Sequence, residues 1–379
     1  MTKISRRNFM HIVGGGTIVA ATTPLAACDV ADSGIQPWAQ AGQYNDPLRN
    51  ALSYALLAPN PHNRQPWMVD LAKSGNALTL YVDTDRLLPD TDPFNRQITV
   101  GLGCFLELMV MAAQAQGYSV ALTLFPDGFD NGALDLRPVA YATFTKADTA
   151  PSPLFKHVLA RRSNKDPFDD TKPVTTDALT TITQAAHADI QTGQTNDEKL
   201  VSHLRELTWQ AFKIEYETPR TLAESIHLMR MGSKEVSANP DGIAMQGAFL
   251  EIMMALGILT KKKMRDPNST AWQQGLDMYE PITATAMGYV WIKTNGNDRI
   301  AQINAGRSWV RMNLAAAEQG LGLHPLSQVL QEYEEMEALY NQIHAELAKS
   351  DQTIQMLGRV GYGKPPAPAP RWPLEAKLI

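Results

Sequence analysis

The sequence predicts an α+β fold built from two related halves joined in one chain, and three observations lead to this prediction. The chain has 379 residues and an apolar fraction of 44%, enough for two ordinary domains or one large α/β domain. Short segments of alternating apolar residues, such as Leu78–Val82, occur beside long segments of helical period, such as Gly101–Gln116. The long helical segment also has a second copy near the C-terminus. These features predict two similar units, each with strands and one long helix.

The second copy is found at an offset of 205 residues, where the helical phase of both segments agrees. Six positions are identical: Gln97, Ile98, Gly101, Ala112, Gln114 and Gly117 correspond to Gln302, Ile303, Gly306, Ala317, Gln319 and Gly322. We therefore expect a first half over residues 46–150 and a second half over residues 151–379.

The first half is expected to begin with a short helix, Leu48–Leu57, which three prolines of the following loop prevent from continuing. Strands at Trp67–Leu71 and Leu78–Val82 would form a hairpin. The helix Gly101–Gln116 carries one wide apolar face, in which Cys104 is expected to be a buried small hydrophobe, and a strand at Val120–Phe125 follows Gly117.

The second half is expected to contain a helix at Leu154–Ala160 and alternating helix and strand over 173–213. A methionine-rich helical insertion, 214–290, is broken at Pro240-Asp-Gly242 and is either a lid or ordinary packing. The remaining elements are a strand at Met287–Lys293, the second long helix at 300–319, a final strand at Ile354–Val360 and a proline-rich arm at 364–370.

The loop Ala58-Pro-Asn-Pro-His-Asn-Arg-Gln-Pro-Trp67 joins the first helix to the first strand. Its prolines make it stiff, and a stiff loop that presents histidine and amide side chains is a typical binding element, although an ordinary proline-rich turn remains an alternative. The stretch resembles the A-P-S-P-H-N-x-Q-P-W motif of the nitroreductase-like flavoproteins, especially their Acg branch, with Asn60 where serine is usual. The resemblance implies that Pro61, His62, Asn63 and Gln65 lie near the ring of a bound FMN.

A second motif, Arg161-Arg-Ser-Asn-Lys165, offers charged and hydroxyl donors suited to a phosphate and a polyol chain. Basic pairs at helix ends are common, so this motif alone is weak. It resembles the arginine-arginine-serine motif of nitroreductases, which implies that Arg161, Arg162, Ser163 and Lys165 hold the phosphate and ribityl tail of FMN. Arg371, in a segment similar to the nitroreductase C-terminus, would join them.

The segment Gly320–Gln328 follows the second long helix, where nitroreductases place backbone amides against the flavin. Amides of this kind stabilise negative charge that gathers on the ring. The resemblance makes Pro325, Leu326 and Ser327 candidates, whereas we interpret His324 as a structural histidine. Nitroreductase subunits pair through long central helices, and the Acg-like branch is similar to such a dimer fused into one chain. A chain that is already a fused pseudo-dimer is expected to be a monomer. Because neither motif occurs in both halves, we expect one flavin per chain.

The N-terminus is interpreted as an export signal rather than as part of the fold. Ser5-Arg-Arg-Asn-Phe-Met10 resembles a twin-arginine signal, and Leu25-Ala-Ala-Cys28 resembles a lipobox. We expect a signal peptide at 1–27, lipidation at Cys28, a tether over 28–45, and a lipoprotein on the periplasmic face of the inner membrane.

Several other functions lack support in the sequence. A net charge of −5 does not suggest nucleic acid as a partner, and the basic run Lys261–Lys263 with Arg265 is too short to change this. No dinucleotide fingerprint, phosphate-binding loop or zinc spacing occurs, and no stretch of the body is expected to reach the length of a membrane-spanning helix.

The sequence-based hypothesis is therefore an FMN-dependent oxidoreductase that reduces a small acceptor by alternating half-reactions. Because nicotinamide cofactors are cytoplasmic, a quinol or redox protein is the expected donor outside the membrane. Two alternatives stay open: a flavin-storage protein with a lid over its FMN, and a structural lipoprotein with an empty site.

Overall fold

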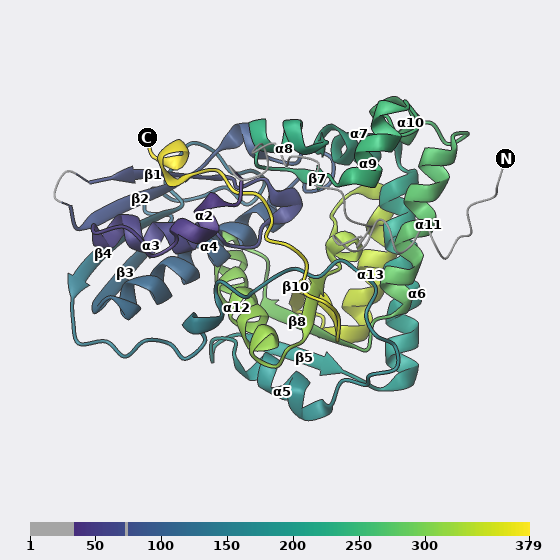
Figure 1. Cartoon of the computed structure of the whole chain (residues 1–379). Helices are drawn as coiled ribbons and strands as arrows, with labels where there is room; N and C mark the ends of the chain where they lie inside the picture. Colours follow the sequence, from purple (N-terminus) through teal and green to yellow (C-terminus); the bar gives the residue numbers. More distant parts are fainter. Residues whose placement is uncertain (1–33, 73–74) are drawn as a thin grey trace.

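The computed structural model describes residues 34–72 and 75–379. The predicted export signal and Cys28 therefore lie outside the described residues. Two four-stranded antiparallel sheets and two long central helices organise the described part of the chain (Figure 1).

The first sheet has the strand order β1-β2-β4-β3 and is formed entirely by the first half. Its strands are β1 (Trp67–Leu71), β2 (Ala77–Val82), β3 (Tyr118–Leu124) and β4 (Ala140–Lys146). The predicted hairpin is confirmed, because Trp67 pairs with Val82 and Leu71 with Leu78. The long helix α4 (Arg96–Ala115) lies between β2 and β3 in the chain.

The second sheet repeats this topology with the order β5-β8-β10-β9. Its strands are β5 (Gln191–Thr195), β8 (Gly288–Asn295), β9 (Gly322–Pro325) and β10 (Gln352–Gly361), and α12 (Arg299–Glu318) lies between β8 and β9. Both sheets follow the same order along the chain. An edge strand and its neighbour come first, and a 20-residue helix follows. The chain then forms the opposite edge strand, and its last strand fills the position between that edge and the second strand. The predicted duplication within an α+β fold is confirmed.

The two long helices touch at glycines. A Cβ atom on Gly103 would lie 2.2 Å from the carbonyl oxygen of Ile303, and one on Gly306 would lie 2.0 Å from that of Val100. The Cys104 Sγ contacts the Gly306 oxygen at 3.1 Å, and burial raises the pKa of this thiol to about 12. The helix contact is therefore backbone to backbone, and Cys104 is the buried small residue that we expected.

Each long helix begins with a buried arginine that reaches into the other half. Arg96 donates to the Gln355 and Leu330 oxygens at 2.6 and 2.5 Å. Arg299 donates to the Phe94 and Asp130 oxygens at 2.7 and 2.9 Å. One apolar core contains residues of both halves, so the halves form one folded unit.

The insertion predicted over 214–290 begins in the last turn of α6 (Glu198–Glu217), and its last helix is α11 (Thr270–Ala284). Together with α6 it separates β5 from β8. Besides helices it contains a small parallel sheet of β6 (Met229–Met231) and β7 (Ile243–Met245) that the sequence did not predict. The other helices between α6 and α11 are α7 (Pro219–His227), α8 (Ser233–Ala238), α9 (Ala248–Ala255) and α10 (Lys261–Met264).

Other elements surround the two sheets. They are α2 (Gln36–Gln40), α3 (Pro47–Ala55), α5 (Thr176–Gln184), α13 (Glu337–Leu347) and the 3-10 turns η1 (Pro61–Asn63), η2 (Thr84–Arg86), η3 (Phe155–His157), η4 (Ser327–Leu330), η5 (Glu334–Met336) and η6 (Leu374–Lys377). After β10 the C-terminal arm returns to the first half, where Ile379 N donates to the Val69 oxygen at 3.0 Å.

Three predictions differ from the structure. The helix expected at Leu154–Ala160 is only the single turn η3, because a segment this short has little helical stability of its own and Phe155 packs instead on Tyr54. Part of the expected tether folds as α2, with Trp38 buried. Helix α4 is long and apolar enough to span a membrane, contrary to expectation, but 89% of its most apolar window is buried inside the protein. It is a core helix.

Candidate functional site

The loop Ala58–Trp67 has an unusual backbone. His62, Asn63 and Gln65 have φ angles of 46°, 52° and 51°, in the left-handed region that side chains other than glycine rarely adopt. Each such residue costs on the order of 1 kcal/mol unless surrounding contacts impose it. The nearby helix α4 allows the loop to approach closely, because Gly101 faces Asn60 and Pro61. The conformation therefore depends on its partners.

The side chains of Asn63 and Gln65 supply much of that support. Asn63 Nδ2 donates to the Pro370 oxygen at 2.9 Å, and its Oδ1 accepts from Arg371 at 2.5 Å. Gln65 Oε1 accepts from the Trp372 amide at 2.9 Å, and its Nε2 donates to the Pro240 oxygen at 2.8 Å. Both were predicted near a flavin ring, but their polar atoms bind the C-terminal arm and the insertion. They hold the loop in place.

His62 lies on the side of the loop that faces the insertion. Its Nε2 is 3.4 Å from the Ser225 hydroxyl in α7, and its buried Nδ1 has no hydrogen-bond partner among the described residues. Burial, followed by the positive charges of Lys165 and Arg64, lowers its pKa to about 4. His62 is therefore neutral at pH 7, with one ring nitrogen available to a ligand.

Arg161 and Arg371 come together at the end of the first helical segment. Arg371 donates to the Leu56 and Ala58 oxygens at 2.9 and 3.1 Å, and Arg161 donates to the Leu57 oxygen at 3.2 Å. Leu56 is the C-cap residue of α3 and the other two residues follow it, so these arginines bind carbonyls at and just beyond the end of the helix. The structure thus brings together two predicted site residues that are 210 positions apart in the chain.

This group, the Arg161/Arg162/Arg371 cluster, carries an excess of positive charge. Burial and the neighbouring arginines lower the pKa of Arg371 to about 9, and burial and Arg162 lower that of Arg161 to about 10. Arg162 stacks on the Trp38 ring at 4.5 Å. In the described part of the chain, no carboxylate forms an ion pair with any of the three, and Arg161 Nε and Nη1 are buried without a hydrogen-bond partner. The cluster has the properties of an anion site.

Lys165 lies near a second set of polar groups. Lys165 is exposed to solvent. Protein atoms around it nevertheless reduce its hydration, which lowers the pKa of its ammonium group, and the negative charge of Glu215 acts in the opposite direction. Glu215, on α6, accepts from Gln331 at 2.8 Å, and burial raises its pKa to about 7. Sequence reasoning missed Glu215, because a lone acid in a helical segment is usually solvated.

His324 is buried in β9, as a structural histidine should be. Arg359 Nε donates to its Nδ1 at 3.0 Å, which leaves the ring proton on Nε2. Burial, Arg359 and Lys165 hold the pKa of His324 well below its usual value. Tyr279 of α11 lies beside it with a ring separation of 6.4 Å.

The remaining predicted residues lie along the edge of the second sheet. Ser163 forms a β-bridge with Leu323, and Pro325 pairs with Gly358 in the register of β9 and β10. The Leu326 amide donates to the Leu357 oxygen at 2.9 Å, so it is committed to the sheet rather than to a ring. Ser327 begins η4, where a helical amide has no acceptor within its own turn. Ser327 therefore stays a candidate, and Leu326 does not.

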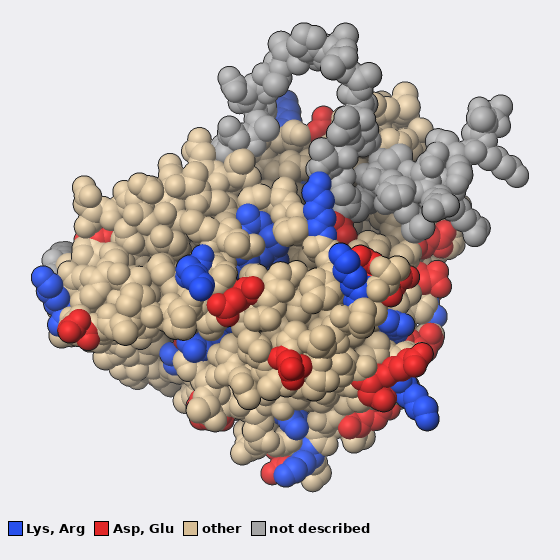
Figure 2. Space-filling model, turned by 60° about the horizontal axis from the view of Figure 1, so that its bottom comes forward, with Lys and Arg blue, Asp and Glu red and all other residues tan. Residues whose placement is uncertain are grey.

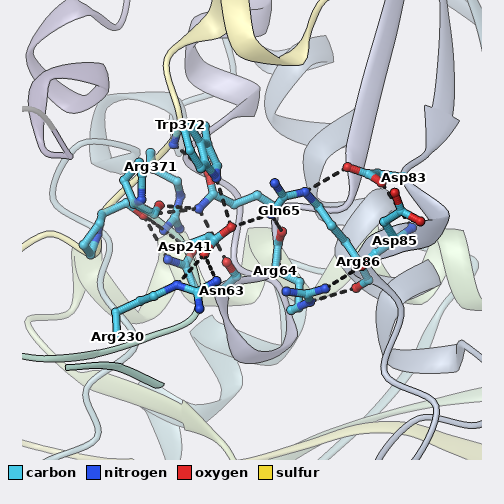
Figure 3. Close-up of polar contacts among 12 residues, drawn as sticks. Asn63, Arg64, Gln65, Asp83, Asp85, Arg86, Arg230, Asp241, Arg371 and Trp372 are labelled. Carbon is cyan, nitrogen blue, oxygen red and sulfur yellow. Dashed lines mark hydrogen bonds and ion pairs between the residues drawn. The ribbon is translucent and has the colours of Figure 1, made fainter. Parts of the chain in front are cut away.

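A further polar network, centred on Asp241, was not predicted. The Asp241 carboxylate is buried and forms ion pairs of 2.5 Å with both Arg86 and Arg230, and it accepts from Trp372 Nε1 at 3.0 Å (Figure 3). Burial alone would raise its pKa, but the bonds from Arg86, Trp372 and Arg230 lower it. The sequence around Asp241 indicated only a break in the insertion. The network joins the insertion, the first half and the C-terminal arm.

Relatives of the chain were found among curated proteins, although no family model matches it. It is 31% identical over 128 residues to the uncharacterized protein Rv3127 and 29% identical over 126 residues to the putative NAD(P)H nitroreductase acg, both of Mycobacterium tuberculosis. Each match covers 32% of this chain and 36% of the relative, so the chain spans about a third of the length of these relatives. Over 330 residues it is 24% identical to the putative NAD(P)H nitroreductase Rv3131 of the same organism, covering 86% of this chain and 88% of the relative.

The chain is similar to nitroreductase-like proteins. Among solved structures it resembles the FMN-dependent nitroreductase NfnB of Mycobacterium smegmatis in complex with NADPH, with a TM-score of 0.36 and 13% identity over 59% of this chain and 96% of that one. A nitroreductase with bound FMN from Bacteroides fragilis gives a TM-score of 0.31 and 13% identity over 56% of this chain and 89% of that one.

Proposed function

We propose that the chain is an FMN-binding oxidoreductase of the nitroreductase-like type. The observation that carries the proposal is the Arg161/Arg162/Arg371 cluster, which has no ion-paired carboxylate among the described residues and keeps two buried guanidinium nitrogens of Arg161 without partners. A terminal phosphate supplies the missing charge and acceptors, because arginine forks match phosphate oxygens. Similarity to putative NAD(P)H nitroreductases, and the bound FMN named for the Bacteroides structure, support FMN as the source of that phosphate.

In this proposal each group has a limited task. Arg161 and Arg371 bind the phosphate, Ser163 and Lys165 bind the tail, and neutral His62 offers Nδ1 as an acceptor or, in its other tautomer, as a donor. Asn63 and Gln65 keep the strained loop in position. When bound, FMN supplies two-electron transfer between a donor and a small oxidised acceptor. The positive charge of Lys165 would stabilise the negative charge that gathers on a bound flavin when it is reduced.

The absorption spectrum of the purified protein tests the cofactor. We expect yellow protein with one FMN per chain, released on denaturation, because the Arg161 motif and the loop each occur once in the sequence. Colourless protein that does not bind added FMN would refute the proposal. Two flavins per chain would refute the proposal of a single site per chain, but not the proposal that the cofactor is FMN.

The electron donor remains part of the proposal. The Mycobacterium smegmatis structure contains NADPH, and two of the relatives reported above are putative NAD(P)H nitroreductases, whereas the twin-arginine and lipobox resemblance favours a quinol or a redox protein. Anaerobic mixing with NADPH and with a reduced quinol distinguishes them, because the competent donor bleaches the flavin absorption.

Flavin storage is the second candidate function. The insertion contacts the loop directly, since Gly242 N donates to the Asn63 oxygen at 3.1 Å and Ser225 approaches His62. Elements in these positions would limit access to a bound ring. Retention of FMN without bleaching by any donor, mediators included, would favour storage over turnover.

The place of action is also proposed. A lipoprotein on the periplasmic face of the inner membrane agrees with the twin-arginine and lipobox sequences. Replacement of Arg6 and Arg7 by lysine should retain the protein in the cytoplasm, and Cys28→Ser should release exported protein from the membrane fraction. If both variants fractionate like the parent protein, the proposed export and lipid anchoring are refuted.

A further inference from the structure

Helix α9 exposes an unusual amount of apolar surface. None of its residues is buried, although its sequence is Ala-Phe-Leu-Glu-Ile-Met-Met-Ala. Ile252 and Leu256 are 56% and 67% exposed, and Ile258 just beyond the helix is 42% exposed. Large exposed hydrophobic side chains are ordinary when scattered, but Ile252 and Leu256 are four residues apart and so lie on one face of the helix, with Ile258 two residues further on. Neighbouring exposed apolar side chains of this kind indicate a partner.

A basic run follows this patch directly. Lys261, Lys262 and Lys263 form most of α10, and Arg265 comes next. Lys263 Nζ donates to the Gly257 oxygen at 2.7 Å and Lys261 Nζ approaches the His227 oxygen at 3.4 Å, so two of the ammonium groups lie against the C-terminal ends of α9 and α7. The positive charge is thereby held beside the apolar residues.

The charge of this segment is opposite to that of the chain. Residues 248–265 contain four basic residues and one acidic residue, Glu251, which gives +3 in a chain of −5. On the face shown in Figure 2, by contrast, basic and acidic side chains are interspersed over a largely uncharged surface.

We propose that α9 and α10 form a docking surface for an anionic phospholipid bilayer. Ile252, Leu256 and Ile258 would enter the headgroup region, and the lysines and Arg265 would face the lipid phosphates. A second copy of the chain fits less well, because pairing the same patch with itself would bring two +3 segments together. In Figure 1, α9 and α10 lie with α7 and α11 at the end of the molecule opposite the first sheet. The proposal does not depend on lipidation of Cys28.

Sedimentation with vesicles tests the surface. The full chain carrying Cys28→Ser, which removes the predicted acylation site, is mixed with phosphatidylcholine vesicles with and without about 30% phosphatidylglycerol. We expect binding to the anionic vesicles that weakens as salt is raised to about 0.5 M. Ile252→Ser with Leu256→Ser should weaken binding about tenfold or more, as should replacement of Lys261, Lys262 and Lys263 by glutamine.

Matched controls lie elsewhere on the surface. Leu136 is 77% exposed in the first half, so Leu136→Ser removes a similar apolar side chain, and Lys156→Gln with Lys172→Gln removes exposed lysines. Both controls should bind like the parent chain. The proposal is overturned if the parent does not bind anionic vesicles or if the α9 variant binds equally well. It is also overturned if sedimentation velocity shows a dimer that the α9 variant abolishes while vesicle binding is unchanged.

Discussion

Two clusters of arginines contact the loop Ala58–Trp67, and they differ in what balances their charge. Arg86 and Arg230 surround the buried carboxylate of Asp241, and Arg86 also donates to the Arg64 oxygen of the loop at 3.2 Å (Figure 3). The Arg161/Arg162/Arg371 cluster meets the loop at Ala58, but its partners in the described chain are carbonyls, the Asn63 amide and the Trp38 ring. The first cluster contains its own carboxylate, and the second lacks one.

The difference separates a structural role from a binding role. Bonds from Arg86, Trp372 and Arg230 outweigh burial and lower the pKa of Asp241, so this carboxylate is stabilised in its charged form. Burial and mutual repulsion instead lower the pKa values of Arg161 and Arg371, so their charged forms are disfavoured. A protein that retains such unbalanced charges gains from an anion that binds there.

The largest expected effect follows from removing the carboxylate of the first cluster. Asp241→Asn leaves the half-buried Arg230 without a carboxylate partner and leaves Arg86 with Asp83 alone, which should lower the free energy of unfolding by about 3 kcal/mol. Urea denaturation of the chain without added FMN measures this. Asp135→Asn is the control, because the Asp135–Arg137 pair is exposed and solvent screens it, so the midpoint should change little. An equal effect of both substitutions would show that the Asp241 network is not structural.

A smaller effect, and one of a different kind, is expected in the second cluster. Arg161→Met removes an unbalanced buried charge while keeping apolar volume, so stability without FMN should not fall. FMN affinity should weaken by about 2 kcal/mol, or roughly 30-fold, through loss of charge-assisted bonds. Calorimetric titration with FMN measures the loss, and Arg137→Met at an exposed site is the control. Lower stability with unchanged FMN affinity would place Arg161 with Asp241 as a structural residue.

The sequence predicted the framework of the fold because periodicity is a local property. Both long helices, the hairpin and the second sheet's long strands were expected within a few residues of their observed bounds. The one-turn η3 and the packed helix α2 could not be expected, because Phe155 and Trp38 owe their environments to distant segments. Trp38 Nε1, for example, donates to the Ala369 oxygen at 2.8 Å.

For the candidate site, residue types were easier to predict than partners. Arg161 and Arg371 were both expected, and the structure brings them together. Asn63 and Gln65 were expected to face a ring, but the return of the C-terminal arm gives them Pro370 and Trp372, some 300 residues away, as partners. No local pattern marks Asp241 or Glu215, because a lone acid in a helical or turn segment is usually solvated. These two acids are buried only because segments distant in the sequence pack around them.

The last expected effect is a pH dependence, and it concerns Glu215, the carboxylate whose charge acts on Lys165. If Glu215 were the missing counter-charge of the nearby cations, its pKa would be depressed. Burial instead raises the pKa to about 7 from an ordinary value of 4.5. The folded state therefore keeps this proton to higher pH than the unfolded state does. The resulting stability is fully present below pH 4.5 and is lost as pH rises towards 7, by about 1 kcal/mol per pH unit.

Glu215→Gln should remove this slope, because glutamine keeps an oxygen to accept from Gln331 and does not titrate. Urea denaturation of both proteins between pH 5 and about 7 measures the difference, in which contributions from other titrating groups such as Asp92 cancel. A wild-type stability that rises with pH relative to the variant would mean that Glu215 is charged and balances Lys165. In that case the cation-rich region would be partly neutralised by the chain itself, and the contrast between the two arginine clusters would be weaker than proposed.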